Sequence, residues 1–167
     1  MAVVGNVVKN WVAPGIAAIL VVAAVQSFFN SRVAVADGDP APDFTLVDTQ
    51  GREVRLAELR GKPVIVNFWG SWCPPCLQEL PGLNSFARSH PEVVLLGIAV
   101  DSGEGEVLAA EKKRLGIPFP VLVADNIVQQ SYGVRVLPTT FLVDDQGIVR
   151  RHHVGVVSPE KLALWLR

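Results

Sequence analysis

Cysteine, histidine and clustered positive charge are all scarce in this chain. Its 167 residues include two cysteines and three histidines, and the formal net charge is −1. Two cysteines alone cannot complete a structural zinc site or build a framework of several disulfides. The densest basic run, at 112–114, falls near the end of an expected helix, where cations complement the helix dipole. Because there is no basic stripe, we expect no nucleic-acid partner.

Formal charge is also missing from residues 10–31, and residues 16–25 are uninterrupted apolar sequence. Such a segment can span a membrane as a helix, which needs about 20 mainly apolar residues. Trp11 and Phe29 stand where aromatic side chains tend to meet the membrane surface. A signal peptide cleaved after Ala36 is the alternative, but a long and partly bulky spacer precedes that site. The pattern favours an uncleaved anchor, and under either interpretation the rest of the chain is exported.

The chain divides into three expected parts. These are a membrane anchor or signal segment at 1–36, a turn-rich linker at 37–42 and a folded domain at 43–167. The folded part is long enough for one ordinary domain. No internal repeat or low-complexity tract interrupts it.

The pattern after the linker predicts a mixed sheet with helices on both faces. Near-continuous apolar runs at 64–69 and 93–100 are typical of strands buried on both faces of a parallel sheet. Apolar residues at helical spacing from Cys76 to Ala87 indicate a helix between them. The other expected elements are a hairpin at 44–47 and 54–56, helices at 104–115 and 126–132, a strand at 119–124, a hairpin at 139–143 and 148–153, and a last helix capped by Ser158.

Cys73 and Cys76 flank two prolines at the expected start of the first helix. A bridge that closes so short a loop constrains the unfolded chain little, so reversible chemistry is favoured over a structural disulfide. Unpaired N–H groups and the helix dipole favour the thiolate of Cys73. Cys76, one turn inside, should be more buried. We therefore predict a redox-active pair in which Cys73 attacks a disulfide and Cys76 resolves the mixed disulfide.

Metal binding is the alternative use of two neighbouring cysteines. The other plausible ligands are His90, His152 and His153. His152 and His153 are consecutive on a predicted strand, so they point to opposite faces and cannot both join one site. A copper-binding assembly factor that uses the two thiolates and a histidine stays as an alternative, and we assign no metal and no cofactor.

The motifs around the cysteines resemble a known family. The residues that carry the likeness are Trp69-Gly-Ser-Trp-Cys-Pro-Pro-Cys76, after a buried strand, and Leu137-Pro138-Thr139, before a later one. They are similar to the thioredoxin superfamily. The first hairpin with its 42–46 segment, the insertion at about 104–124 and Glu79 resemble the TlpA/ResA branch of membrane-anchored bacterial oxidoreductases. The resemblance implies a thioredoxin-like α/β fold with an N-terminal β-hairpin and a central αβ insertion.

The resemblance also implies roles for single residues. Pro138 matches the family's cis-proline, which packs beside the disulfide and leaves the backbone of Leu137 open to a substrate strand. Glu79 matches an acidic residue near the buried cysteine, and a partly buried carboxyl group there could accept the proton of Cys76. Trp72, next to the cysteines, is expected to be an exposed aromatic residue that contacts partners.

The branch typically reduces cysteines of apocytochrome c before haem attachment, or cysteines of other exported proteins, with electrons from a membrane thiol carrier. We therefore expect a disulfide reductase on the extracytoplasmic side of the bacterial cell membrane, although compartment alone does not decide between reduction and oxidation. Asn67 departs from cytoplasmic thioredoxins, which carry a buried aspartate there. A peroxiredoxin is the other alternative, but peroxide chemistry needs a threonine three residues before the cysteine, and that place holds Gly70.

Overall fold

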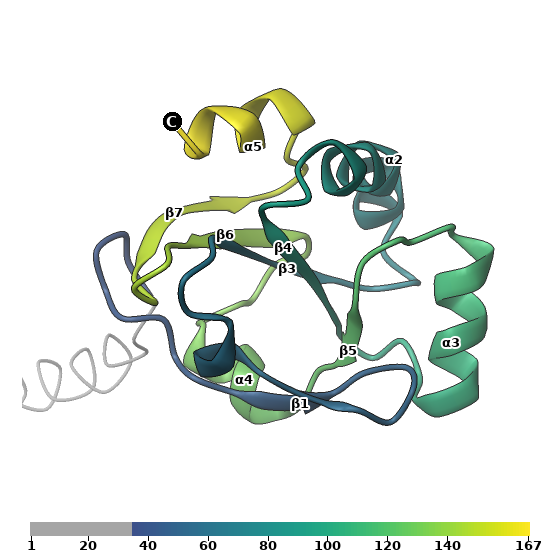
Figure 1. Cartoon of the computed structure of the whole chain (residues 1–167). Coiled ribbons are helices and arrows are strands. Elements are labelled where there is room, and N and C mark those ends of the chain that lie inside the picture. The colour runs from purple at the N-terminus through teal and green to yellow at the C-terminus, as the bar shows by residue number, and fades with distance from the viewer. Residues whose placement is uncertain (1–34) are drawn as a thin grey trace, which may run out of the picture. The chain divides into compact units, whose positions relative to one another are not determined.

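The computed structural model describes residues 35–167 of the chain (Figure 1). The anchor predicted from residues 10–31 lies outside this range. Among the residues that the structure describes, no helix is both long and apolar enough to cross a membrane.

Every helix and strand predicted within residues 43–167 is present. In chain order the elements are β1 (Thr45–Val47), β2 (Glu53–Arg55), the 3-10 helix η1 (Leu56–Leu59), β3 (Val64–Trp69), α2 (Pro74–Ser89), β4 (Val94–Ala99), α3 (Gly105–Arg114), β5 (Val121–Val123), α4 (Asn126–Ser131), β6 (Thr139–Val143), β7 (Val149–Val154) and α5 (Pro159–Trp165). The expected cap of the last helix is confirmed, because the side chain of Ser158 accepts a hydrogen bond from the backbone N–H of Lys161.

Five strands form the central mixed sheet, in the order β5-β4-β3-β6-β7. β3 and β4 are parallel, as are β4 and β5, whereas β6 is antiparallel to both β3 and β7. β1 and β2 form the separate N-terminal hairpin. The predicted mixed sheet is thereby confirmed, with β3 at its centre.

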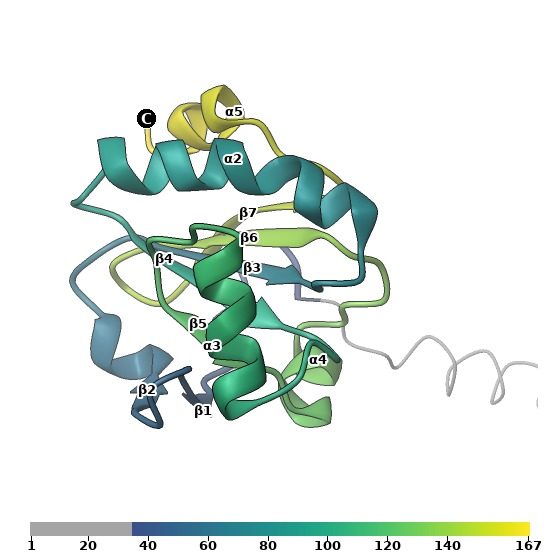
Figure 2. The ribbon, with the colours of Figure 1, turned by 90° about the vertical axis from the view of Figure 1, so that its right-hand side faces the viewer.

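Helices cover both faces of this sheet (Figures 1 and 2). One core cluster joins the sheet to α2, α3 and α5, through Leu80, Leu108 and Leu162 respectively. The other joins the opposite face to α4 and to the hairpin, through Tyr132 and Leu46 among others. β3 contributes to both clusters, which explains why its predicted run is apolar at every position but Asn67.

Residues 37–42, expected as a linker, lie along the edge strand β7. The N–H of Gly38 donates to the carbonyl of Val149 at 2.7 Å, and the N–H of Ala41 donates to that of Gly147 at 2.9 Å. Val35 is buried in the core cluster on the α4 side of the sheet. Ordered packing against the sheet therefore begins before residue 43.

Candidate redox site

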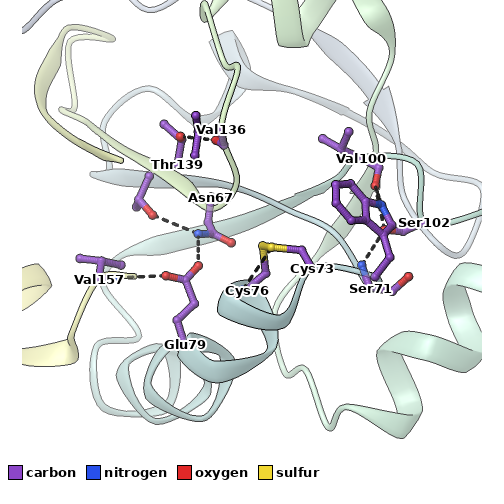
Figure 3. Close-up of a disulfide and its surroundings, with 12 residues drawn as sticks. Asn67, Ser71, Cys73, Cys76, Glu79, Val100, Ser102, Val136, Thr139 and Val157 are labelled. Carbon is purple, nitrogen blue, oxygen red and sulfur yellow. Dashed lines mark hydrogen bonds between the residues drawn. A yellow bond between two sulfur atoms is a disulfide. The ribbon is translucent and has the colours of Figure 1, made fainter. Parts of the chain in front are cut away.

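The cysteine pair lies where β3 leads into α2 (Figure 3). Cys73 is the extended residue that caps α2, and Pro74 and Pro75 fill the first helical positions, where a missing N–H costs little. The Sγ of Cys73 accepts from the backbone N–H of Cys76 at 3.3 Å. Cys73 and Cys76 are joined by a disulfide, with Cα atoms 5.3 Å apart. The sequence prediction that the pair opens this helix is confirmed.

Both sulfur-bearing residues are buried in this oxidised form. Cys73 is 3% exposed and Cys76 is 0% exposed. The expected order of burial holds, although the difference is small. A reductant that approaches from solvent therefore meets Cys73, since that residue alone of the two retains any exposed surface.

Trp72 is the exposed aromatic residue that the sequence predicts, with 58% of its surface accessible. Its indole is fixed from one side, because Nε1 donates to the carbonyl oxygen of Val100 at 3.1 Å. The neighbouring N–H of Ser71 donates to the hydroxyl of Ser102 at 2.9 Å, and that hydroxyl donates to Val100. The loop after β4 thus holds the turn that carries Trp72 beside the disulfide.

Gly70 lies directly under that indole. A Cβ atom built on Gly70 would be 2.9 Å from Nε1 of Trp72 and 3.3 Å from the carbonyl oxygen of Val100. Atoms at such a distance must shift, so any side chain at position 70 would displace Trp72. The threonine that peroxide chemistry requires at this position has no room in the present geometry.

Pro138 stands at the start of β6, and the Leu137–Pro138 peptide bond is cis, as predicted. Leu137 is partly buried and packs against the cluster that contains both cysteines. β6 begins only at Thr139, so within residues 35–167 the backbone of Leu137 has no strand partner. Val136, one residue earlier, is 55% exposed. Residues 136–138 thus form a bend before β6, and Leu137 lies in this bend with its backbone free of a strand partner in the described part of the chain.

Glu79 is a buried carboxyl group, only 3% exposed. Its Oε1 accepts from Nδ2 of Asn67 at 2.8 Å, and its Oε2 accepts from the N–H of Val157 at 3.0 Å. Burial raises the pKa of Glu79, because the loss of hydration outweighs these two hydrogen bonds, which act in the opposite direction. The expected partly buried carboxyl group with a raised pKa is present, and an exposed position in the first turn is excluded.

Two further polar side chains join this carboxyl group, and neither was predicted from the sequence to belong to the site. Nδ2 of Asn67 also donates to the hydroxyl of Thr140 at 3.0 Å. Asn67 and Thr140 lie opposite each other in β3 and β6, and both are 0% exposed. The available signal was a polar residue inside an otherwise apolar strand, since a buried polar group needs a hydrogen-bond partner.

The three histidines do not gather around the cysteines. His152 contacts Asp37 and stacks on Phe141, whereas His153 contacts Lys161. His90 lies at the C-terminal end of α2. Residues 35–167 contain no group of three or more histidine, cysteine, aspartate or glutamate side chains that is placed to hold a metal ion.

Three features together define a class of protein. A disulfide joins the ends of a Cys-Pro-Pro-Cys motif, the motif opens a helix that packs on a mixed sheet, and a cis-proline segment lies beside it. The chain is a thioredoxin-like thiol–disulfide oxidoreductase. The model of the AhpC/TSA family matches residues 38–152, more than half of the chain, and the chain belongs to that family.

Individual relatives agree with this class. The chain is 42% identical over 139 residues to the thiol-disulfide oxidoreductase ResA of Geobacillus thermodenitrificans, which covers 81% of this chain and 79% of that protein. A thiol:disulfide interchange protein of the thioredoxin family from Chlorobium tepidum is 30% identical, with a TM-score of 0.70 over 80% of this chain and 97% of its own. A secreted disulfide oxidoreductase of Mycobacterium tuberculosis, homologous to DsbE of E. coli, is 26% identical, with a TM-score of 0.65 over 74% of this chain and 93% of its own.

Proposed function

We propose that this oxidoreductase is an extracytoplasmic reductase of disulfides in exported proteins, such as apocytochrome c during cytochrome c maturation. The observation that carries the proposal is the Cys73–Cys76 disulfide at the start of α2, with the buried carboxyl group of Glu79 on the same helix. The apolar segment 10–31 would tether the enzyme to the bacterial cell membrane. The secreted structural relative supports a position outside the cytoplasm.

The chemistry of the proposed reduction is a pair of exchanges. The thiolate of Cys73 attacks a substrate disulfide, a Cys73–substrate bond forms, and one substrate thiolate leaves. Cys76 then gives up its proton, and its thiolate attacks Sγ of Cys73. The Cys73–Cys76 bond forms as the mixed disulfide breaks and the second substrate thiolate leaves. The substrate gains two electrons and the enzyme loses two, which a membrane thiol carrier returns.

The position of each group suits these steps. The backbone N–H of Cys76 already donates to Sγ of Cys73, and the start of α2 stabilises negative charge on that sulfur. Cys76 is fully buried, so its proton needs an acceptor inside the protein. Glu79 is the proposed acceptor, because the raised pKa of its carboxyl group brings it closer to that of a thiol.

The proposed substrate surface consists of Trp72, Val136, Leu137 and Pro138. Trp72 and Val136 offer exposed apolar area near the disulfide. The unpaired backbone of Leu137 can accept an extended segment of the substrate as an additional strand. A surface of this kind binds cysteine-bearing chains largely through their backbone, which fits a substrate that is itself unfolded or extended.

The peroxiredoxin alternative that the sequence raises leaves a peroxidase as the competing function. Gly70 argues against it, because the indole of Trp72 occupies the space that a threonine side chain needs at that position. The same packing keeps Trp72 at the mouth of the site, where a protein substrate would meet it. Turnover of hydrogen peroxide with a thiol donor, measured beside insulin reduction, separates the two functions.

A trapping experiment tests the proposed substrate. Cys76→Ala removes the resolving thiol, so the full chain should retain a mixed disulfide between Cys73 and its substrate in membranes of the native host. We expect mass spectrometry of this adduct to identify cysteine-bearing exported proteins, apocytochrome c among them. The double variant that also carries Cys73→Ser is the matched control and should trap nothing. Adducts only with cytoplasmic proteins would refute the extracytoplasmic role.

Carbonate extraction tests the proposed tether. A chain held by 10–31 should stay with the membrane fraction, whereas release of a shorter protein that begins at Asp37 would show cleavage after Ala36.

A further inference from the structure

The side-chain carbonyl of Asn67 is a buried acceptor that has no hydrogen-bond partner among the described residues. The residue is 0% exposed, and only its nitrogen is engaged, by Glu79 and Thr140. Leaving such an oxygen unpaired costs stability, so it requires an explanation. The oxidised form therefore contains an acceptor without a donor in the middle of the redox site.

The direction of this oxygen identifies the missing donor. Side chains alternate along a strand, so Asn67 shares a face of β3 with Ile65 and Trp69. Those two residues belong to the same core cluster as Cys73 and Cys76. Figure 3 shows the amide nitrogen of Asn67 toward Glu79 and its carbonyl oxygen on the side of the disulfide. The unpaired acceptor thus faces the sulfur atoms.

Neither sulfur carries a proton while the two are bonded to each other. When two electrons and two protons open the bond, Cys76 becomes a buried thiol, and a thiol is a hydrogen-bond donor. We propose that in the reduced enzyme the Cys76 thiol donates to Oδ1 of Asn67, and that this one amide positions the proton shared between Cys76 and Glu79. The inference rests on the proposed role of Cys76 as the resolving thiol.

An amide suits both ends of the proton transfer because its two arms are alike in shape and opposite in polarity. With the proton on Cys76, Oδ1 accepts from the thiol and Nδ2 donates to the ionised Glu79. With the proton on Glu79, a half-turn of the amide lets Nδ2 donate to the Cys76 thiolate and Oδ1 accept from the carboxyl group. The hydroxyl of Thr140 can accept or donate, so it serves either orientation. Asn67 is therefore a positioning residue.

Infrared spectroscopy of the S–H stretch tests the hydrogen bond directly. In the full chain with Cys73→Ser, Cys76 is the only thiol, so the band belongs to it alone. We expect this band to lie at lower wavenumber than in the variant that also carries Asn67→Leu, which is similar in shape but cannot accept. An identical band in the two variants would overturn the proposal.

Asn84 provides the matched control. It is also buried on α2, its nitrogen donates to the carbonyl of Leu115, and its own carbonyl has no partner in the described part of the chain. Adding Asn84→Leu to Cys73→Ser should leave the band unchanged.

A second measurement serves if Asn67→Leu fails to fold. It compares the ¹³Cγ resonances of Asn67 and Asn84 in the natural sequence between the oxidised and reduced forms. We expect reduction to move that of Asn67 alone, and equal behaviour of the two would refute the hydrogen bond.

The resolving step provides a functional measurement. Release of a small thiol from its mixed disulfide with Cys73 should be about tenfold slower in Asn67→Leu, the rate equivalent of one hydrogen bond lost from the transition state. Its pH profile should also change, which a purely structural effect would not produce. An unaltered rate and profile would exclude the positioning role. None of these measurements involves apocytochrome c, so failure of the proposed substrate would be recognised separately.

Discussion

Replacing Glu79 by glutamine tests whether this carboxyl group ionises inside the folded protein. Burial raises the pKa of Glu79 above the ordinary value of 4.5, while the bonds from Val157 and Asn67 oppose that rise. In the unfolded chain the carboxyl group is hydrated and has an ordinary pKa. Between the two pKa values the folded state therefore binds more protons than the unfolded state.

The sign of the pH dependence follows from this difference. The stabilising contribution of the protonated Glu79 is complete below the unfolded-state pKa and is lost as the pH rises to the folded-state pKa. Across that interval the free energy of unfolding falls by up to about 1.4 kcal/mol for each pH unit. Glu79→Gln has no group that titrates there. The difference in free energy of unfolding, variant minus wild type, should rise with pH across the interval and be level on either side.

Urea unfolding of the oxidised full chain over a series of pH values measures this difference. Glu106→Gln is the matched control, because it removes the same charge from an exposed position on α3. A level curve for Glu79→Gln would mean that the buried carboxyl group has the same pKa in the folded and unfolded states. A falling curve would mean that its pKa is lowered by folding. Either result would refute the proposed acid–base role.

Two further substitutions test the surroundings of the site. Gly70→Ala places a Cβ atom 2.9 Å from Nε1 of Trp72, so it should lower the free energy of unfolding by about 1–3 kcal/mol and also slow insulin reduction. A normal melting temperature and rate would show that Trp72 moves without consequence. Thr140→Val leaves one N–H of Asn67 unpaired, and urea unfolding should show a loss of about 1–3 kcal/mol. The exposed Thr45→Val is the control, and an equally small loss in both would mean that the hydroxyl of Thr140 contributes nothing.

Strong periodic signals made most of the fold predictable. The run Val64–Trp69 is apolar but for Asn67, and it forms β3 with the bounds expected from the sequence. The weakest match is the predicted strand at 119–124, of which only Val121–Val123 forms strand β5. Pro120 has no N–H to donate and joins β4 through its carbonyl alone, which accepts from the N–H of Gly97. Turn-rich composition at 37–42 suggested a linker, but composition does not reveal that a segment pairs with a strand edge more than 100 residues later.

Part of the site was predictable because its residues are neighbours in the sequence, and the family resemblance added Leu137 and Pro138. Cys73, Cys76 and Glu79 lie within two turns of one helix, so their common position could be inferred from spacing. The hydrogen-bond partners of Glu79 could not be inferred from spacing. Val157 is 78 residues away and follows β7, and Asn67 meets the carboxyl group only because β3 passes beneath α2. Contacts of this kind depend on how the sheet is assembled, which local spacing does not specify.

The same assembly explains why polar groups persist in this core. Apolar side chains of similar volume could fill the space of Asn67, Glu79 and Thr140, and burying an acid there lowers stability at neutral pH. Yet a fully buried thiol cannot exchange its proton with water, so a proton acceptor must be buried with it. That acceptor in turn needs donors, which β3 and the segment after β7 supply. Under the proposed mechanism, the hydrogen bond from Val157 anchors the segment that precedes α5 and also holds the carboxyl group of Glu79 in place. Substitutions that loosen this segment should therefore slow resolution of the mixed disulfide at a degree of destabilisation that still leaves the protein folded.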